Sequence, residues 1–201
     1  AMCKKLHADG FNVVGNYHTK EKADKWLEQM KSEGFNIKLF YGDVSDFESA
    51  AEMIKKIEAE VGTIDTLVNN AGITRDSRLV NMKKDDWYAV INTNLNSVFN
   101  CTKNVLDGMI ERKFGRIINI SSVNGQRGQF GQTNYSAAKA GMHGFTKSLA
   151  MEVAKYGVTV NTISPGYIGT DMVMAVPEKV LNQIVAQVPV GRLGGTHEVA
   201  H

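Results

Sequence analysis

The sequence is short of cysteine, of net charge and of long apolar runs, and each shortage removes a class of protein. Only Cys3 and Cys101 are present among 201 residues, without a Cys-x-x-Cys spacing, so no redox motif is expected. We interpret both as reduced structural thiols of a cytoplasmic protein. The 23 Lys and Arg residues are scattered among 21 Asp and Glu residues, which leaves no basic footprint for nucleic acid or a membrane surface.

No apolar run approaches the roughly 18 residues of a membrane span, and no secretory signal pattern opens the sequence. With 43% hydrophobic and 22% charged residues, the composition is that of an ordinary globular domain. The opening "AMCKKLHADGF" has the pattern of the last turns of an amphipathic helix ending at Gly10. We therefore expect the sequence to begin inside an element.

Apolar, β-branched segments alternate with helical segments along the chain. The predicted strands are residues 11–17, 36–43, 64–72, 115–122 and 157–166. The main predicted helices are residues 20–34, 46–62, 83–112 and 134–155. Short strands separated by helices predict an α/β fold with a parallel sheet covered on both faces, the doubly wound Rossmann arrangement.

Polar residues follow three of the predicted strands. They are "NNAG" at 69–72, "SS" at 121–122 and "SPG" at 164–166. Any one of them could be turn chemistry alone. Because the carboxyl ends of parallel strands meet at one edge, where ligands bind, three such endings predict a binding site there.

The stretch "NYSAAK" places Tyr135 four residues before Lys139, on the same face if the segment is helical. An ammonium near a phenol favours phenolate and lowers a pKa that starts near ~10, which suits proton transfer. The alternative is two residues that merely share a helix surface, because the pattern is short and common.

Five motifs in this order resemble the short-chain dehydrogenase/reductase family: "NNAG", "NTNL", "ISS", "NYSAAK" and "SPGYIGTDM". The similarity covers essentially the whole chain. Within the family, "SSVNGQRGQFGQTNYSAAKAG" most resembles the acetoacetyl-CoA reductases of polyhydroxyalkanoate synthesis, followed by 3-oxoacyl-carrier-protein reductases. The resemblance implies NADPH-dependent reduction of acetoacetyl-CoA to (R)-3-hydroxybutanoyl-CoA. It also implies a homotetramer with the helices from about 83 and 134 at an interface.

The resemblance further implies a catalytic tetrad of Asn94, Ser122, Tyr135 and Lys139. Tyr135 would protonate the ketone oxygen, Lys139 would lower the tyrosine pKa and bind the nicotinamide ribose, and Ser122 would polarise the carbonyl. Asn94 would serve a water-mediated proton relay, although a surface asparagine is the default interpretation without the family. Ser121 is interpreted as a turn hydroxyl.

The expected NADPH contacts fall into three groups. The adenine side is assigned to Asp43 and Val44, the ribose and nicotinamide side to Asn70, Ala71, Gly72, Tyr135 and Lys139, and the carboxamide side to Pro165, Gly166 and Thr170. NADPH is favoured over NADH because "NYHTK" offers no acid before Glu21. His18 or Lys20 could meet a 2′-phosphate, but a charged loop is as easily solvated.

The loop "GQRGQFGQ" at 125–132 is assigned to the substrate. Its glycines resemble a phosphate cradle, but their spacing differs from a dinucleotide fingerprint and the loop follows a late strand. The residues expected to hold the 3-oxobutanoyl and pantetheine portions are Ser122, Gln129, Phe130, Gln132 and Tyr167.

The last five residues, "HEVAH", match the zinc pattern His-Glu-x-x-His, with His197 and His201 as ligands and Glu198 as base. We assign no metal, because no third ligand is evident and chain ends fray. The segment "VPVGRLGGTHEVA" instead resembles the reductases' own "P-x-x-R-x-G-x-x-x-E-[IV]-A".

The family's Gly-rich pyrophosphate turn and its last strand are not in this sequence. We therefore expect residues 1–201 to be a single Rossmann-type reductase domain, incomplete at both ends, that alone binds cofactor weakly and lacks activity. Two alternatives stay open besides zinc. They are a 3-oxoacyl-[acyl-carrier-protein] reductase of fatty-acid synthesis and a non-catalytic cofactor-binding relative.

Overall fold

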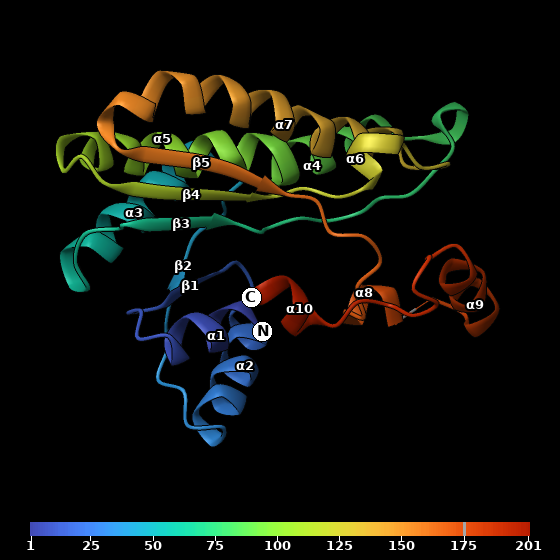
Figure 1. Cartoon of the computed structure of the whole chain (residues 1–201), viewed down its shortest axis with the longest axis horizontal. Coiled ribbons are helices and arrows are strands. Elements are labelled where there is room, and N and C mark those ends of the chain that lie inside the picture. Colours follow the sequence, from blue (N-terminus) through green and yellow to red (C-terminus); the bar gives the residue numbers. More distant parts are fainter. Residues whose placement is uncertain (175) are drawn as a thin grey trace. The chain divides into compact units, whose positions relative to one another are not determined.

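The computed structural model describes residues 1–174 and 176–201, which form two compact units. The first unit contains residues 1–15, 19–39 and 165–201, and the second contains residues 16–18 and 40–164. Helices and strands alternate along the chain, as predicted for an α/β protein (Figure 1). The strands form two sheets rather than one, a two-stranded β1-β2 sheet and a three-stranded β3-β4-β5 sheet.

The β1-β2 sheet consists of β1 (Val14–Tyr17) and β2 (Lys38–Tyr41), and both strands run from the first unit into the second. The helices of the first unit are α1 (Met2–Ala8), α2 (Lys20–Ser32), α8 (Asp171–Met174), α9 (Glu178–Ala186) and α10 (Thr196–Ala200). Helix α1 packs against α10. The predicted helix end at Gly10 is confirmed, since α1 stops just before this glycine, whose φ is 90°.

The second unit is built on β3 (Thr66–Asn69), β4 (Gly115–Ile120) and β5 (Val158–Ile163). The helical segments around them are α3 (Phe47–Glu60), η1 (Leu79–Asn81), α4 (Lys84–Ile91), η2 (Asn92–Asn96), α5 (Ser97–Glu111), α6 (Asn124–Arg127), α7 (Thr133–Val153) and η3 (Ala154–Tyr156). The central strand β4 pairs in parallel with both neighbours, with Asn69 opposite Asn119 and Ile120 opposite Ile163. This register brings the three strand ends to one edge, as the sequence predicted.

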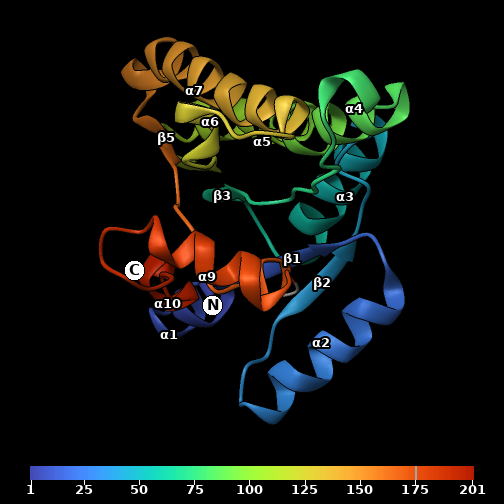
Figure 2. The same cartoon turned by 90° about the vertical axis from the view of Figure 1, so that its right-hand side faces the viewer.

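The helices of the second unit form because their apolar residues recur at helical spacing. Helix α3 begins at Asp46, whose carboxylate accepts the Ser49 N–H at 2.8 Å, and it buries Ala50, Ile54 and Ile57. Helices α5 and α7 lie on the same side of the three-stranded sheet (Figure 2). The largest side chains that they and the sheet bury completely are Val98, Val105, Met109, Ile117, Met142, Val153 and Val158. Each such side chain contributes roughly 1.5–3 kcal/mol.

The helix predicted over 83–112 has the predicted extent, but it is not α-helical throughout. Residues 92–96 form a π-helical segment between α4 and α5. Such segments are concentrated at functional sites. Periodicity alone could not show it, because one widened turn barely changes the spacing of apolar residues over 30 positions.

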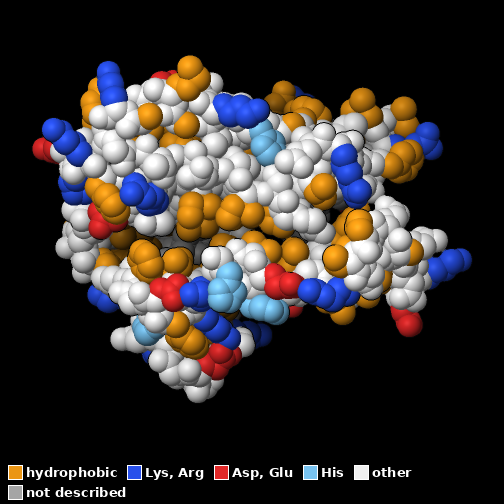
Figure 3. Space-filling model, viewed as in Figure 1, with side chains coloured by type: hydrophobic (Ala, Val, Ile, Leu, Met, Phe, Trp, Pro, Cys, Tyr) orange, Lys and Arg blue, Asp and Glu red, His pale blue; other side chains and the backbone are white. Residues whose placement is uncertain are grey.

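No described helix is long and apolar enough to cross a membrane. Basic and acidic side chains are interspersed over the face shown in Figure 3. This distribution agrees with the small formal net charge of +2.

Candidate active site

A buried row of polar side chains crosses the three-stranded sheet near its carboxyl edge. Asn69 donates hydrogen bonds to Asn119 at 2.9 Å and to Thr102 at 3.2 Å. Asn119 donates to Thr146 at 2.9 Å, and the Thr146 hydroxyl lies 2.6 Å from that of Thr162. Because these groups are partnered away from solvent, the row fixes the strand ends relative to α5 and α7. The sequence analysis missed it, and polar residues inside apolar strands were the only signal.

Ser122 and Tyr135 come close together just beyond β4, as the family resemblance implied. Tyr135 lies in the first turn of α7, where its N–H donates to the Asn134 side chain at 2.8 Å. Its hydroxyl lies near enough to that of Ser122 for the serine to lower the tyrosine pKa. The Ser122 hydroxyl also accepts the Asn124 N–H at 3.1 Å. The pair is therefore held from both of the elements that supply it.

The predicted lowering of the tyrosine pKa is wrong for this structure. Burial raises the pKa of Tyr135 above its usual value, the charge of Asp76 adds to the rise, and the hydrogen bond with Ser122 opposes it. The Lys139 ammonium lies 5.6 Å from the centre of the Tyr135 ring and donates to the Ile120 carbonyl at 2.7 Å. The phenol is therefore held protonated, which suits an acid.

Lys139 is buried, with only 3% of the residue exposed, and burial lowers its pKa to about 8. Gly72 and Asn94 lie beside it, since a Cβ on Gly72 would be 3.7 Å from the Lys139 Nζ and 3.5 Å from the Asn94 Oδ1. An ammonium has three N–H donors, and Ile120 takes one of them. The other two suit sugar hydroxyls, so this donor set fits a nicotinamide ribose.

Asn94 is completely buried, which rules out the default interpretation of a surface asparagine. Its side chain accepts the Ile73 N–H at 2.8 Å and donates to the Ile73 carbonyl at 2.9 Å. Both ends of the amide are therefore committed to the loop after β3. The part of Asn94 that a proton relay could use is the backbone of the π-helical segment.

Ser121 is a buried structural hydroxyl, and the interpretation of it as a turn hydroxyl is wrong. It donates to the Lys139 carbonyl at 2.8 Å and lies 3.2 Å from the His143 Nε2. The same imidazole nitrogen lies 3.5 Å from the Ser164 hydroxyl. His143 thus joins the ends of β4 and β5, and the sequence analysis assigned it no role.

The residues assigned to adenine lie around the turn after β2. Asp43 accepts the Ser45 hydroxyl at 2.6 Å and the Ser45 N–H at 2.9 Å, and these bonds lower its pKa. The His18 Nε2 lies 3.7 Å from this carboxylate, and its ring stacks on Tyr41. The Val44 carbonyl accepts from Asn100 at 2.9 Å. His18, Asp43 and Val44 therefore belong to one ordered surface of the second unit.

Beyond β3, Asn70 and Gly72 are exposed and Ala71 is partly exposed, so this stretch is open to a ligand. The assigned residues after β5 belong to the first unit. They are Pro165, Gly166, Tyr167 and Thr170. The Tyr167 carbonyl accepts the Gly194 N–H at 2.9 Å, and the Thr170 carbonyl accepts the Met174 N–H at 2.9 Å at the start of α8.

The residues assigned to the substrate differ in their availability. Gln129 is exposed, and Phe130 is 83% exposed. Gln132 instead uses both ends of its amide within the protein, accepting from Asn124 at 3.0 Å and donating to Asp76 at 2.7 Å. The sequence analysis assigned no role to Asp76 or Asn124.

In the C-terminal zinc pattern, the Glu198 side chain makes other contacts. Glu198 pairs with Arg192 at 2.7 Å and accepts the Gly195 N–H at 2.6 Å, and together these lower its pKa to about 2. Among the described residues, no group of three His, Cys, Asp or Glu could hold a metal.

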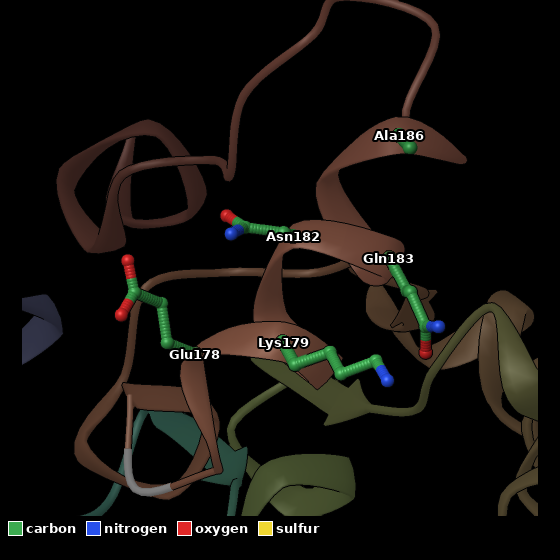
Figure 4. A pocket seen from close by; sticks show the side chains of 5 residues that line it. All are labelled: Glu178, Lys179, Asn182, Gln183 and Ala186. Atoms are coloured by element: carbon green, nitrogen blue, oxygen red, sulfur yellow. The ribbon is translucent and has the colours of Figure 1, made fainter.

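One hollow in the first unit lies along α9 (Figure 4). Its lining residues are Glu178, Lys179, Asn182, Gln183 and Ala186. All five come from a single helix, and none is a predicted site residue. The hollow therefore adds nothing to the candidate active site.

Comparison with known proteins shows similarity along the whole chain. The model of the family described as short chain dehydrogenase matches residues 1–181. The chain is 57% identical to the acetoacetyl-CoA reductase of Cupriavidus necator, over 100% of this chain and 82% of that reductase. It is 56% identical to nodulation protein G of Azospirillum brasilense, over 99% of this chain and 81% of that protein. It is 46% identical to the 3-oxoacyl-[acyl-carrier-protein] reductase of Escherichia coli, over 100% of this chain and 81% of that reductase.

Proposed function

This chain belongs to the short-chain dehydrogenase family, whose enzymes are oxidoreductases with a nicotinamide cofactor, and we propose that it reduces acetoacetyl-CoA to (R)-3-hydroxybutanoyl-CoA with NADPH. The observation that carries the proposal is the approach of Ser122 to the hydroxyl of Tyr135, on the helix that also presents buried Lys139. Relatives named acetoacetyl-CoA reductase, at 50–57% identity, support the substrate.

The bound cofactor supplies the hydride that the ketone carbon accepts. The Ser122 hydroxyl donates a hydrogen bond to the ketone oxygen and so stabilises the negative charge that develops there. Tyr135 gives that oxygen its proton, and its raised pKa keeps the proton available at neutral pH. Lys139 holds the ribose through the N–H donors that Ile120 does not use.

The cofactor proposal also specifies NADPH in preference to NADH. Within "NYHTK", His18 lies in the second unit with the other adenine-side residues, and no carboxylate precedes Glu21 in that stretch. The His18 Nε2 lies 3.7 Å from the Asp43 carboxylate, and His18 is the side chain that we assign to a 2′-phosphate. We further propose a cytoplasmic homotetramer, supported by exposed Phe99 on α5 and Met151 on α7.

A second candidate substrate is the same acyl group on a carrier protein. Relatives at 46% identity are named as reductases of such thioesters, which favours this substrate less than CoA. The rest of the proposed mechanism is common to both, because the reacting ketone is the same.

The test is steady-state oxidation of NADPH with acetoacetyl-CoA and, separately, with an acetoacetyl carrier protein. It compares the purified chain alone with the chain joined at both ends to the segments of its 57%-identical relative that lie outside the match. In the joined protein we expect reduction of the CoA thioester, a preference for NADPH over NADH, and loss of activity by a factor of about 10² or more in Tyr135→Phe. Circular dichroism of the variant checks that it is folded. Turnover only with the carrier protein would favour the second candidate, and full activity of Tyr135→Phe would disprove the assigned acid.

A further inference from the structure

A chain of three side chains connects the loop after β3 with the catalytic pair. Asp76, in that loop, accepts from the Gln132 Nε2 at 2.7 Å. The Gln132 Oε1 accepts from the Asn124 Nδ2 at 3.0 Å. The Asn124 N–H donates to the Ser122 hydroxyl at 3.1 Å. The side-chain hydrogen bonds therefore run from Asp76 to Asn124, and the backbone N–H of Asn124 completes the connection to Ser122.

The hydrogen bonds along this chain have a fixed direction. A carboxylate only accepts, so Asp76 requires the Gln132 amide to turn its NH2 group toward it. The Gln132 carbonyl must then face Asn124, and Asn124 must present its own NH2 group. The Asn124 Oδ1 is consequently left as a buried acceptor with no partner among the described residues. One acidic side chain thus sets the orientation of two neutral amides.

The segment that carries this chain is also tied to the catalytic residues by its backbone. The Ser77 N–H donates to the Gly131 carbonyl at 2.8 Å, which joins the same two loops a second time. A Cβ on Gly125 would lie 2.7 Å from the backbone carbon of Lys139, so α6 sits directly against α7 there. Moving residues 124–132 would therefore move the surroundings of Ser122 and Lys139 together.

We propose that Asp76, Gln132 and Asn124 are positioning residues for the reaction proposed above, and that their directed hydrogen bonds hold residues 123–132 and the Ser122 hydroxyl in the orientation that reduction needs. Gln132 then acts through its neighbours and does not grip the substrate. The two roles differ in kinetics, because a positioning residue affects kcat and a gripping residue affects KM.

The test exchanges the donor and the acceptor across one bond. In Gln132→Glu two carboxylates face each other, so we expect kcat to fall about tenfold or more while KM changes little. Adding Asp76→Asn places an amide donor opposite the introduced carboxylate, and we expect the double variant to recover most of kcat. Asp76→Asn alone still accepts from Gln132 and should lose little. Asp85→Asn, an exposed carboxylate at the start of α4, is the matched control for loss of charge.

Hydrogen exchange of peptides covering residues 73–82 and 123–132 gives a readout that needs no substrate. We expect faster exchange at both peptides in Gln132→Glu and slow exchange again in the double variant. A double variant as impaired as Gln132→Glu, or a rise in KM alone, would overturn the proposal. If the wild type does not reduce acetoacetyl-CoA, the proposed function fails. The exchange pattern still decides whether the hydrogen bonds that link Asp76, Gln132 and Asn124 order these loops.

Discussion

At the scale of single residues, we expect Lys139 to set the alkaline limit of the proposed reaction. Its ammonium is charged below a pKa of about 8 and loses its proton above it, so ribose binding should be present at lower pH and weaken as pH rises. We expect kcat/KM for reduction to fall about tenfold per pH unit above pH ~8. The measurement is the pH dependence of kcat/KM for the wild type and for Lys139→Arg. Because arginine stays charged, the variant should not show the fall at alkaline pH. A wild-type profile that stays flat to pH ~10 would contradict the assignment.

Individual site residues could be predicted where a local motif carries them. Spacing placed Tyr135 and Lys139 on one helix face, and the family resemblance added Ser122, which follows a strand. Asp76 and His143 could not be found this way. Their contacts join residues 56 and 22 positions apart, and such pairs depend on how β3, β4 and α7 pack.

At the scale of elements, the packing of α6 against α7 leads to a prediction at Gly125. A Cβ there would lie 2.7 Å from the Lys139 backbone carbon and 2.9 Å from the Ala140 nitrogen, and backbone atoms cannot move aside as a flexible side chain can. Gly125→Ala should therefore cost roughly 1–3 kcal/mol of stability and lower kcat by about 10². Thermal unfolding and steady-state kinetics measure the two effects.

The matched control is Gly144→Ala on α7, where a Cβ meets nothing within 4 Å inside the single chain. This change should stabilise the protein by roughly 0.5–1 kcal/mol, because alanine favours a helix over glycine. Equal effects of the two substitutions would show that α6 does not pack on α7 as described.

Most elements were predictable because apolar spacing distinguishes a strand from a helix, and the parallel β3-β4-β5 order agrees with the expected fold. Spacing does not say which strands become neighbours. The division into a β1-β2 sheet and a separate β3-β4-β5 sheet therefore had to come from the structure.

At the scale of the whole molecule, the two units differ in how much they bury. In the second unit, β4, β5 and α7 enclose fully buried side chains such as Ile117 and Met142, and the polar row from Asn69 to Thr162 joins the three strands. In the first unit, α2 buries Ala23 and Met30, whereas α1, α9 and α10 bury no residue.

Because amides exchange through local opening where few apolar contacts oppose it, the two units should exchange hydrogen at different rates. We expect peptides from α9 and α10 to exchange about a hundredfold or more faster than peptides from β4 and α7 in the same sample. Mass spectrometry after a timed exposure to deuterated buffer measures both at once. Asn119→Ala, which removes the centre of the polar row and leaves its buried partners unpaired, should speed exchange in β4 and α7 while leaving α9 unchanged. Equal protection of α9 and β4 in the wild type would mean that the first unit is stabilised by more than the contacts within it.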